Sequence, residues 1–115
     1  MDRVERRRAV RMKPIPDCPA SAEFIDGRTD PVSIQDVGAG GMALRLSSAP
    51  GNLPVGERLR LRVSLSHWGS HELTAEVRYQ TPEGVTGVQF VELSPEVTRA
   101  VWHYVAELLE RGAPS

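Results

Sequence analysis

Arg7 and Arg11 stand four positions apart near the start of this 115-residue chain. Residues at this spacing share a face of a helix, and in an extended segment they lie about 13 Å apart at ~3.3 Å per residue. A guanidinium group binds a phosphate through two hydrogen bonds, bonds the O6 and N7 edge of guanine, and stacks on a purine ring. The pair therefore suits one ligand that offers phosphates and guanines together, with Arg6 and Arg8 as auxiliary contacts.

The charge around this pair differs from that of the rest of the chain. Residues 1–13 contain six basic and two acidic residues, a net charge of +4, whereas the remainder carries −5. A protein that coats DNA through counterion release needs basic residues over a broad face, so the pattern favours a small, compact anion over nucleic acid. From this segment alone, a disordered basic terminus that only solubilises the chain is the alternative.

A second group of residues with useful chemistry is the segment QDVGAGG, residues 35–41. We expect it to form a turn between two strands, where Asp36 accepts the N1 and N2 hydrogens of guanine, an edge that adenine does not present. Gly38, Gly40 and Gly41 allow the backbone to take positive φ and to approach a ligand closely, with exposed amides available to an anion. An ordinary glycine-rich hairpin with an aspartate is the alternative.

Several classes of function are not expected. Cys18 is the only cysteine, so an internal disulfide is excluded, and with three scattered histidines it forms no zinc-binding pattern; no metal is expected. No spacing matches a nucleophile motif or a paired-carboxylate signature, so we do not expect an enzyme. The sequence has no run of about 20 apolar residues and no signal peptide, which predicts a cytoplasmic protein without membrane insertion.

The elements that must position these residues follow from hydrophobic periodicity. Pro14, Pro16 and Pro19 stop any helix that starts in the arginine-rich segment, so residues 1–19 are expected to be a flexible basic arm. Alternating apolar and polar residues then predict six short strands. The strands are expected at residues 20–26, 31–37, 41–47, 58–65, 72–80 and 85–93.

The short connections between these strands favour antiparallel pairing. Six strands in about 75 residues predict a mainly β domain over residues 20–111, an antiparallel β-barrel that is closed or nearly closed. Ser94 followed by Pro95 and Glu96 predicts the start of a C-terminal α-helix. Apolar residues then recur at helical spacing up to Gly112, so this helix is expected to lie on the barrel.

Taken together, these features resemble the PilZ family of cyclic di-GMP receptors, from about Arg6 to Leu109. The family motif RxxxR corresponds to Arg7 and Arg11, and the motif [D/N]xSxxG corresponds to Asp36, Gly38 and Gly41. The segment GVTGVQFVELSPE, residues 84–96, is similar to the last strand and helix start of that family. One position departs from the pattern, because Gly38 stands where the family has serine.

The resemblance implies a small receptor or adaptor that binds cyclic di-GMP, needs no metal, and signals to an unidentified protein effector in motility, pilus, biofilm or polysaccharide control. It also implies that the missing serine hydroxyl removes one contact with the nucleotide. A hydrogen bond of that kind is worth ~0.5–1.5 kcal/mol, up to about tenfold in affinity. We therefore expect weakened rather than abolished binding.

Two alternatives belong to other classes. The first is a nucleotide-independent PilZ-like module for protein interaction that acts through its terminal helix and the turn at Trp68. The second is a nucleic-acid binder that uses the barrel face, which would show steep salt dependence and no preference for the cyclic dinucleotide.

Overall fold

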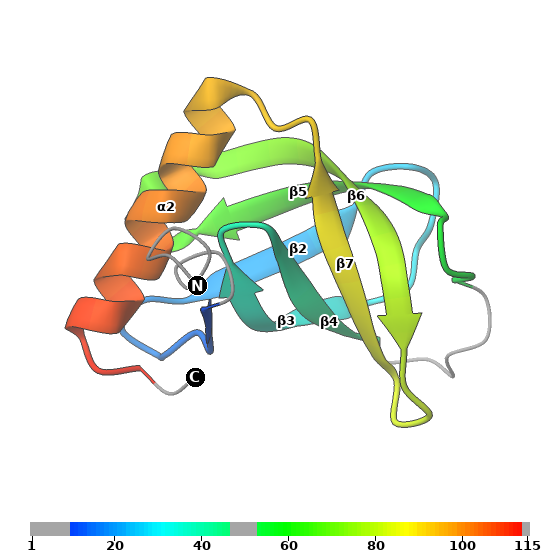
Figure 1. Ribbon diagram of the computed structural model, residues 1–115, viewed down its shortest axis with the longest axis horizontal. Helices are drawn as coiled ribbons and strands as arrows, with labels where there is room; N and C mark the ends of the chain where they lie inside the picture. Colours follow the sequence, from blue (N-terminus) through cyan, green and yellow to red (C-terminus); the bar gives the residue numbers. More distant parts are fainter. Residues whose placement is uncertain (1–9, 47–52, 114–115) are drawn as a thin grey trace, which may run out of the picture.

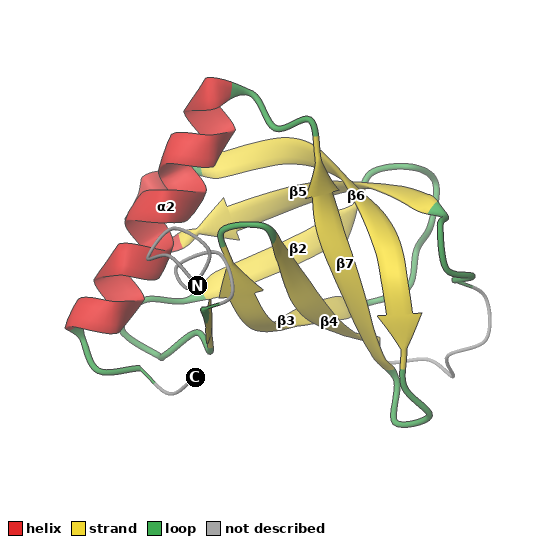
Figure 2. Ribbon diagram, viewed as in Figure 1, coloured by secondary structure: helices red, strands yellow, loops and turns green. Residues whose placement is uncertain are grey.

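The computed structural model describes residues 10–46 and 53–113, which form one antiparallel sheet and a C-terminal helix (Figures 1 and 2). The strands run in the order β1-β3-β4-β7-β6-β5-β2, and a short 3-10 turn, η1, joins β5 to β6. The strands are β1 Arg11–Met12, β2 Ala20–Phe24, β3 Val32–Gly38, β4 Gly41–Leu46, β5 Arg58–Leu65, β6 Ser70–Gln80 and β7 Val85–Val91; η1 is Ser66–Trp68 and α2 is Pro95–Glu110.

The mainly β class and the C-terminal helix are confirmed, but the expected six-stranded barrel, closed or nearly closed, is not confirmed in its details. Seven strands are present in the described residues, and β1 and β2, at the two ends of the order, are not hydrogen-bonded to each other. The additional strand is β1, whose Arg11 and Met12 pair with Gly38 and Val37. Two residues are too few to produce a periodic signal, which is why the sequence pattern did not predict it.

The segment before β2 also differs from the expectation. The sequence predicts a flexible arm over residues 1–19, whereas residues 10–19 pack against the rest of the fold, with Met12 and Cys18 buried. The hydroxyl of Tyr104 on α2 donates to the carbonyl oxygen of Cys18 at 2.7 Å. Prolines prevent a helix here but are compatible with extended chain at a sheet edge. Arg6, Arg7 and Arg8 lie outside the described residues.

The core fills the concave side of the curved sheet and the contact with α2. Alternate residues of β5 point inward, as the sequence predicts, and all four are buried: Leu59, Leu61, Val63 and Leu65. The helix begins where expected, because the Ser94 hydroxyl accepts a hydrogen bond from the Val97 amide at 3.2 Å and Pro95 occupies the first turn. Among the described residues, none of the helices has the length and apolar composition that a membrane crossing requires.

Candidate functional site

The arginine of β1 and the aspartate of β3 are in direct contact. Arg11 Nη1 lies 3.0 Å from Asp36 Oδ1, and the two side chains are 37% and 20% exposed. The two residues are 25 positions apart in sequence, and the pairing of β1 with β3 brings them together. Two groups that were predicted to bind the same ligand therefore lie at one edge of the sheet.

Asp36 does not lie in a turn as expected, because β3 continues through it to Gly38. The turn itself consists of Ala39 and Gly40. Gly38, Gly40 and Gly41 do not take the positive φ that glycine allows; among the described residues, the glycines with positive φ are at positions 27, 56, 69, 84 and 112.

Gly38 and Gly41 instead provide space for neighbouring atoms. A Cβ atom at Gly38 would lie 2.7 Å from the Val10 carbonyl oxygen and 2.9 Å from Arg11 Cδ. A Cβ atom at Gly41 would lie 2.2 Å from the Val88 carbonyl oxygen. Gly38 therefore allows Arg11 to cross β3, and Gly41 allows β4 to approach β7 closely, whereas a Cβ atom at Gly40 would meet nothing within 4 Å.

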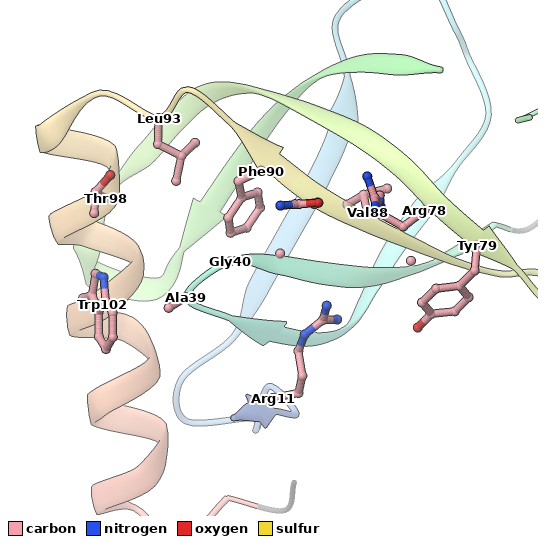
Figure 3. Close-up of a pocket in the computed structure, with 13 residues that line it drawn as sticks. Arg11, Ala39, Gly40, Arg78, Tyr79, Val88, Phe90, Leu93, Thr98 and Trp102 are labelled. Atoms are coloured by element: carbon pink, nitrogen blue, oxygen red, sulfur yellow. The ribbon is translucent and has the colours of Figure 1, made fainter. Parts of the chain in front are cut away.

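An open pocket of about 550 Å³ lies beside this contact (Figure 3). It extends between Trp102 on α2 and Tyr79 on β6, and the Arg11 side chain reaches into it from β1. Its lining residues come from five elements, the β3–β4 turn and the β7–α2 loop: Arg11, Ala39, Gly40, Gly41, Arg78, Tyr79, Gly87, Val88, Gln89, Phe90, Leu93, Thr98 and Trp102.

Of the predicted site residues in the described part of the chain, Arg11 and Gly41 line the pocket directly. Asp36 does not line the pocket but contacts Arg11, which does, and Gly38 lies beneath Arg11. The remaining predicted residues, Arg6, Arg7 and Arg8, cannot be placed because they precede the described residues.

Arg78 and Tyr79 of β6 form one side of the pocket and were not predicted as site residues. Regular alternation along this strand places Tyr79 on the same face as Leu73, Ala75 and Val77, yet Tyr79 is 45% exposed. The reason is a bulge between Val77 and Tyr79, which inserts Arg78 and leaves both Arg78 and Tyr79 on the outer face. Bulges are common next to functional sites, where they redirect side chains.

The Tyr79 ring lies over Gly87, its partner on β7. A Cβ atom at Gly87 would lie 1.9 Å from Cε2 of that ring, so only glycine leaves room for it. A glycine inside a strand is a recognisable sign of such a close approach and was the available signal for this part of the site.

The pocket thus combines cationic groups with aromatic surfaces. Arg11 and Arg78 line the same pocket as Tyr79, Phe90 and Trp102. Arg78 also pairs with Glu76 at 3.1 Å. Such a set of side chains can bind an anion that carries flat rings. In the described part of the chain there is no group of three or more His, Cys, Asp or Glu residues able to hold a metal ion.

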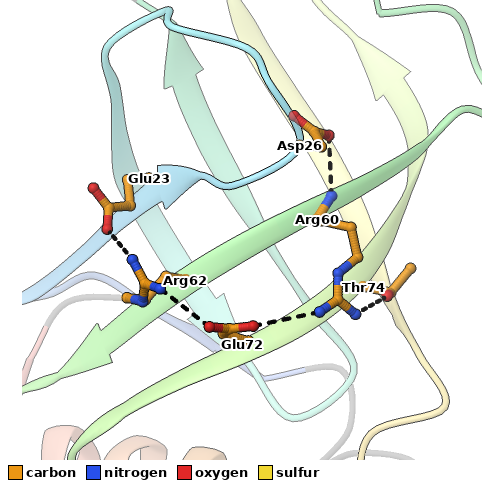
Figure 4. A network of polar contacts seen from close by, with 6 residues as sticks. All are labelled: Glu23, Asp26, Arg60, Arg62, Glu72 and Thr74. Carbon is orange, nitrogen blue, oxygen red and sulfur yellow. Dashed lines mark hydrogen bonds and ion pairs between the residues drawn. The ribbon is translucent and has the colours of Figure 1, made fainter.

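A second arginine-rich surface on β5 has a different character (Figure 4). Arg62 contacts Glu23 at 2.7 Å and Glu72 at 3.0 Å, and Arg60 contacts Glu72 at 3.6 Å. These ion pairs cross-link β2, β5 and β6. Carboxylates partly neutralise these arginines, as they do Arg11 and Arg78, but Arg60 and Arg62 do not line the pocket with its aromatic rings.

Comparisons with known proteins agree with this architecture. The model of the PilZ domain family matches residues 5–107. The PilZ domain of YcgR from Escherichia coli with cyclic di-GMP is 22% identical, with a TM-score of 0.70 over 93% of this chain and 94% of that chain. A structure of YcgR in complex with cyclic di-GMP, also from E. coli, is 22% identical, with a TM-score of 0.71 over 93% of this chain and 47% of that chain.

An uncharacterized Legionella protein is 16% identical, with a TM-score of 0.56 over 89% of this chain and 96% of that chain. At these identities the likeness to solved structures establishes the fold. No curated protein sequence matches the chain.

Proposed function

Because the chain belongs to the PilZ domain family, we propose that it is a non-enzymatic receptor for cyclic di-GMP that binds at the pocket beside Arg11. The observation that carries this proposal is the 3.0 Å contact between Arg11 and Asp36 at the edge of that pocket. Structures of the same fold in complex with cyclic di-GMP support it.

In this proposal Arg11 and Arg78 contact the phosphates and the O6 and N7 edges of the guanines. A guanidinium group bonds both types of acceptor in a bidentate manner. Tyr79, Phe90 and Trp102 offer ring faces on which a base stacks, a contact worth ~1–3 kcal/mol per base. Arg7, with Arg6 and Arg8 as auxiliaries, completes the cationic side.

The carboxylate of Asp36 is proposed to read the N1 and N2 hydrogens of guanine. Asp36 accepts a hydrogen bond from Arg11, so contact with guanine would exchange one charged contact for others. The two groups hold each other near the pocket before the ligand arrives, which reduces the cost of ordering them. Because the side chains of Arg11 and Asp36 are both partly exposed, the affinity for cyclic di-GMP should depend on salt concentration.

The glycine at position 38 removes the hydroxyl that serine provides in the family motif. We propose that the remaining groups, Arg7, Arg11, Asp36 and Gly41, still support binding with reduced affinity. The substitution Gly38→Ser is not a clean test of this contact, because its Cβ atom would collide with Val10 and Arg11 in the ligand-free protein.

We further propose that the basic N-terminal arm, of which residues 1–9 lie outside the described part of the chain, folds over the bound nucleotide and changes the surface that an effector protein contacts. The setting would be a cytoplasmic pathway of motility, pilus, biofilm or polysaccharide control, as the family resemblance implies. Limited proteolysis with and without cyclic di-GMP tests this folding of the arm. The arm should be protected from cleavage only in the presence of the nucleotide.

Isothermal titration tests the function itself. We expect cyclic di-GMP to bind in the micromolar range or more tightly and cyclic di-AMP to bind at least tenfold more weakly, because adenine lacks the edge that Asp36 reads. Arg11→Ala should abolish or strongly weaken binding, whereas the matched control Arg62→Ala, which removes an exposed arginine of β5, should not. No heat up to high micromolar cyclic di-GMP would contradict the proposal and favour the nucleotide-independent interaction module.

A further inference from the structure

The strand that carries Asp36 contains one residue more than its partner. The register of β3 against β4 shifts between Ile34 and Asp36, so Gln35 is inserted opposite β4. Ile34 and Val37, on either side of the insertion, are buried, whereas Gln35 and Asp36 are both partly exposed. A bulge of this kind places two consecutive side chains on one face of the sheet.

The two side chains make contacts on opposite sides of β3. Asp36 contacts Arg11 on β1, and the Gln35 side-chain oxygen accepts a hydrogen bond from Arg45 Nη2 on β4 at 2.9 Å. β1 and β4 are the two neighbours of β3 in the sheet. Each of the two consecutive residues is therefore attached to a different neighbouring strand.

Arg45 is itself held in place at its other nitrogen. Its Nη1 donates to the carbonyl oxygen of Glu83 in the β6–β7 turn at 3.3 Å. Its backbone is paired on both sides, with Ser33 on β3 and Val85 on β7. Arg45 is exposed and does not line the pocket, so it cannot act on a ligand there by direct contact.

We propose that Arg45 and Gln35 are positioning residues for the nucleotide site: their hydrogen bond holds the β3 bulge in the geometry that turns Asp36 toward Arg11. Without that bond Gln35 is released, and the bulged backbone can rotate so that Asp36 leaves Arg11. The position of Asp36 against Arg11 does not depend on a nucleotide. The expected effect of Arg45 and Gln35 on cyclic di-GMP affinity rests on the proposed function.

The first experiment uses the ligand-free full chain and NMR signals of the Arg11 side chain. Arg45→Ala and Gln35→Ala should move these signals toward their positions in Asp36→Ala. Gln35→Glu, which keeps an acceptor for Arg45, should leave them close to wild type, and so should the control Arg62→Ala. Unchanged Arg11 signals in Arg45→Ala would overturn the proposal whether or not the protein binds a nucleotide.

The second experiment is a cyclic di-GMP titration of the same variants. Arg45→Ala and Gln35→Ala should each weaken binding about three- to tenfold, and the double variant should be no weaker than either one, because both act through one contact. Arg45→Ala in an Asp36→Ala background should have no further effect.

An equal loss of affinity in both backgrounds would show that Arg45 acts independently of Asp36, and an unchanged affinity of Arg45→Ala would show that it has no role; either result overturns the proposal. If the Arg11 signals move as expected but wild type binds no cyclic di-GMP, the proposed function fails while the positioning by Arg45 and Gln35 stands.

Discussion

The Arg11 side chain crosses β3 directly over Gly38, with its Cδ atom 2.9 Å from the position that a Cβ atom of residue 38 would occupy. The Val10 carbonyl oxygen is closer still to that position, at 2.7 Å. Residue 38 therefore lies beneath the segment that carries a proposed ligand-binding arginine, and the absence of a side chain there is part of how β1 packs.

This relationship predicts that Gly38→Ser destabilises the ligand-free protein. The added atoms overfill a close contact, which typically costs about 1–3 kcal/mol. The matched control is Gly40→Ser two residues away, where a Cβ atom meets nothing within 4 Å. Thermal unfolding should show a lower midpoint for Gly38→Ser than for Gly40→Ser, and equal midpoints would show that β1 does not pack over Gly38.

A second prediction concerns the carboxylate of Asp36. Asp36→Ala removes the carboxylate that contacts Arg11 and is proposed to contact guanine. Hydrogen bonds that involve a charged group are worth about 1.5–3 kcal/mol, so affinity for cyclic di-GMP should fall about tenfold or more. Titration calorimetry measures this, with Glu72→Gln on the β5–β6 surface as the control. An affinity equal to that of wild type would exclude Asp36 from the binding site.

The Tyr79 ring provides a third prediction. If a guanine stacks on it, Tyr79→Ala should weaken cyclic di-GMP binding by about 1–3 kcal/mol, and Tyr79→Phe should retain most of the affinity because the ring remains. Gly87→Ala should have an effect similar to that of Tyr79→Ala, since its methyl group would displace the ring. If Tyr79→Ala binds as tightly as wild type does, the ligand does not use this end of the pocket.

A substitution at Tyr104 tests the packing of the fold separately from the proposed binding site. Its hydroxyl is buried and donates to the Cys18 carbonyl oxygen, and burial raises the pKa of Tyr104, so the group remains a donor even at alkaline pH. Tyr104→Phe leaves that carbonyl without this partner, which should cost about 1–3 kcal/mol and lower the unfolding midpoint by about 4 °C or more. Nucleotide affinity should not change, and a midpoint equal to that of wild type would argue against the packing of residues 10–19.

The last prediction is a pH dependence of stability that arises from Glu107 on α2. Burial tends to raise the pKa of Glu107, but hydrogen bonds from Trp68 and Arg111 outweigh it, and the pKa lies below its usual value of 4.5. A carboxylate with a lowered folded-state pKa stabilises the protein above its unfolded-state pKa, and this contribution is lost as the pH falls through the folded-state value. Urea unfolding between pH 3 and 6 should therefore show a steeper loss of stability below pH 4.5 in wild type than in Glu107→Gln. Parallel profiles would contradict the assignment to Glu107.

The periodic parts of the fold could be predicted from the sequence because each depends on a local pattern. Alternating leucine and valine residues placed β5 correctly, and Ser94 with Pro95 located the start of α2. β1 and the two bulges could not be predicted in this way. β1 is too short to show a period, and an inserted residue such as Gln35 or Arg78 shifts the alternation at a point that no local pattern identifies.

The same division applies to the candidate site. The sequence by itself determined which residue types are available, since arginine, aspartate and glycine at these spacings have chemistry that depends on the side chains alone. Only the tertiary structure decided that Arg11 contacts Asp36, that Gly38 provides space rather than positive φ, and that Tyr79 faces outward over Gly87. These relationships depend on the pairing of strands distant in the chain and on the bulges within them. Strand pairing is set by the packing of the whole sheet, so no single segment of the sequence specifies it.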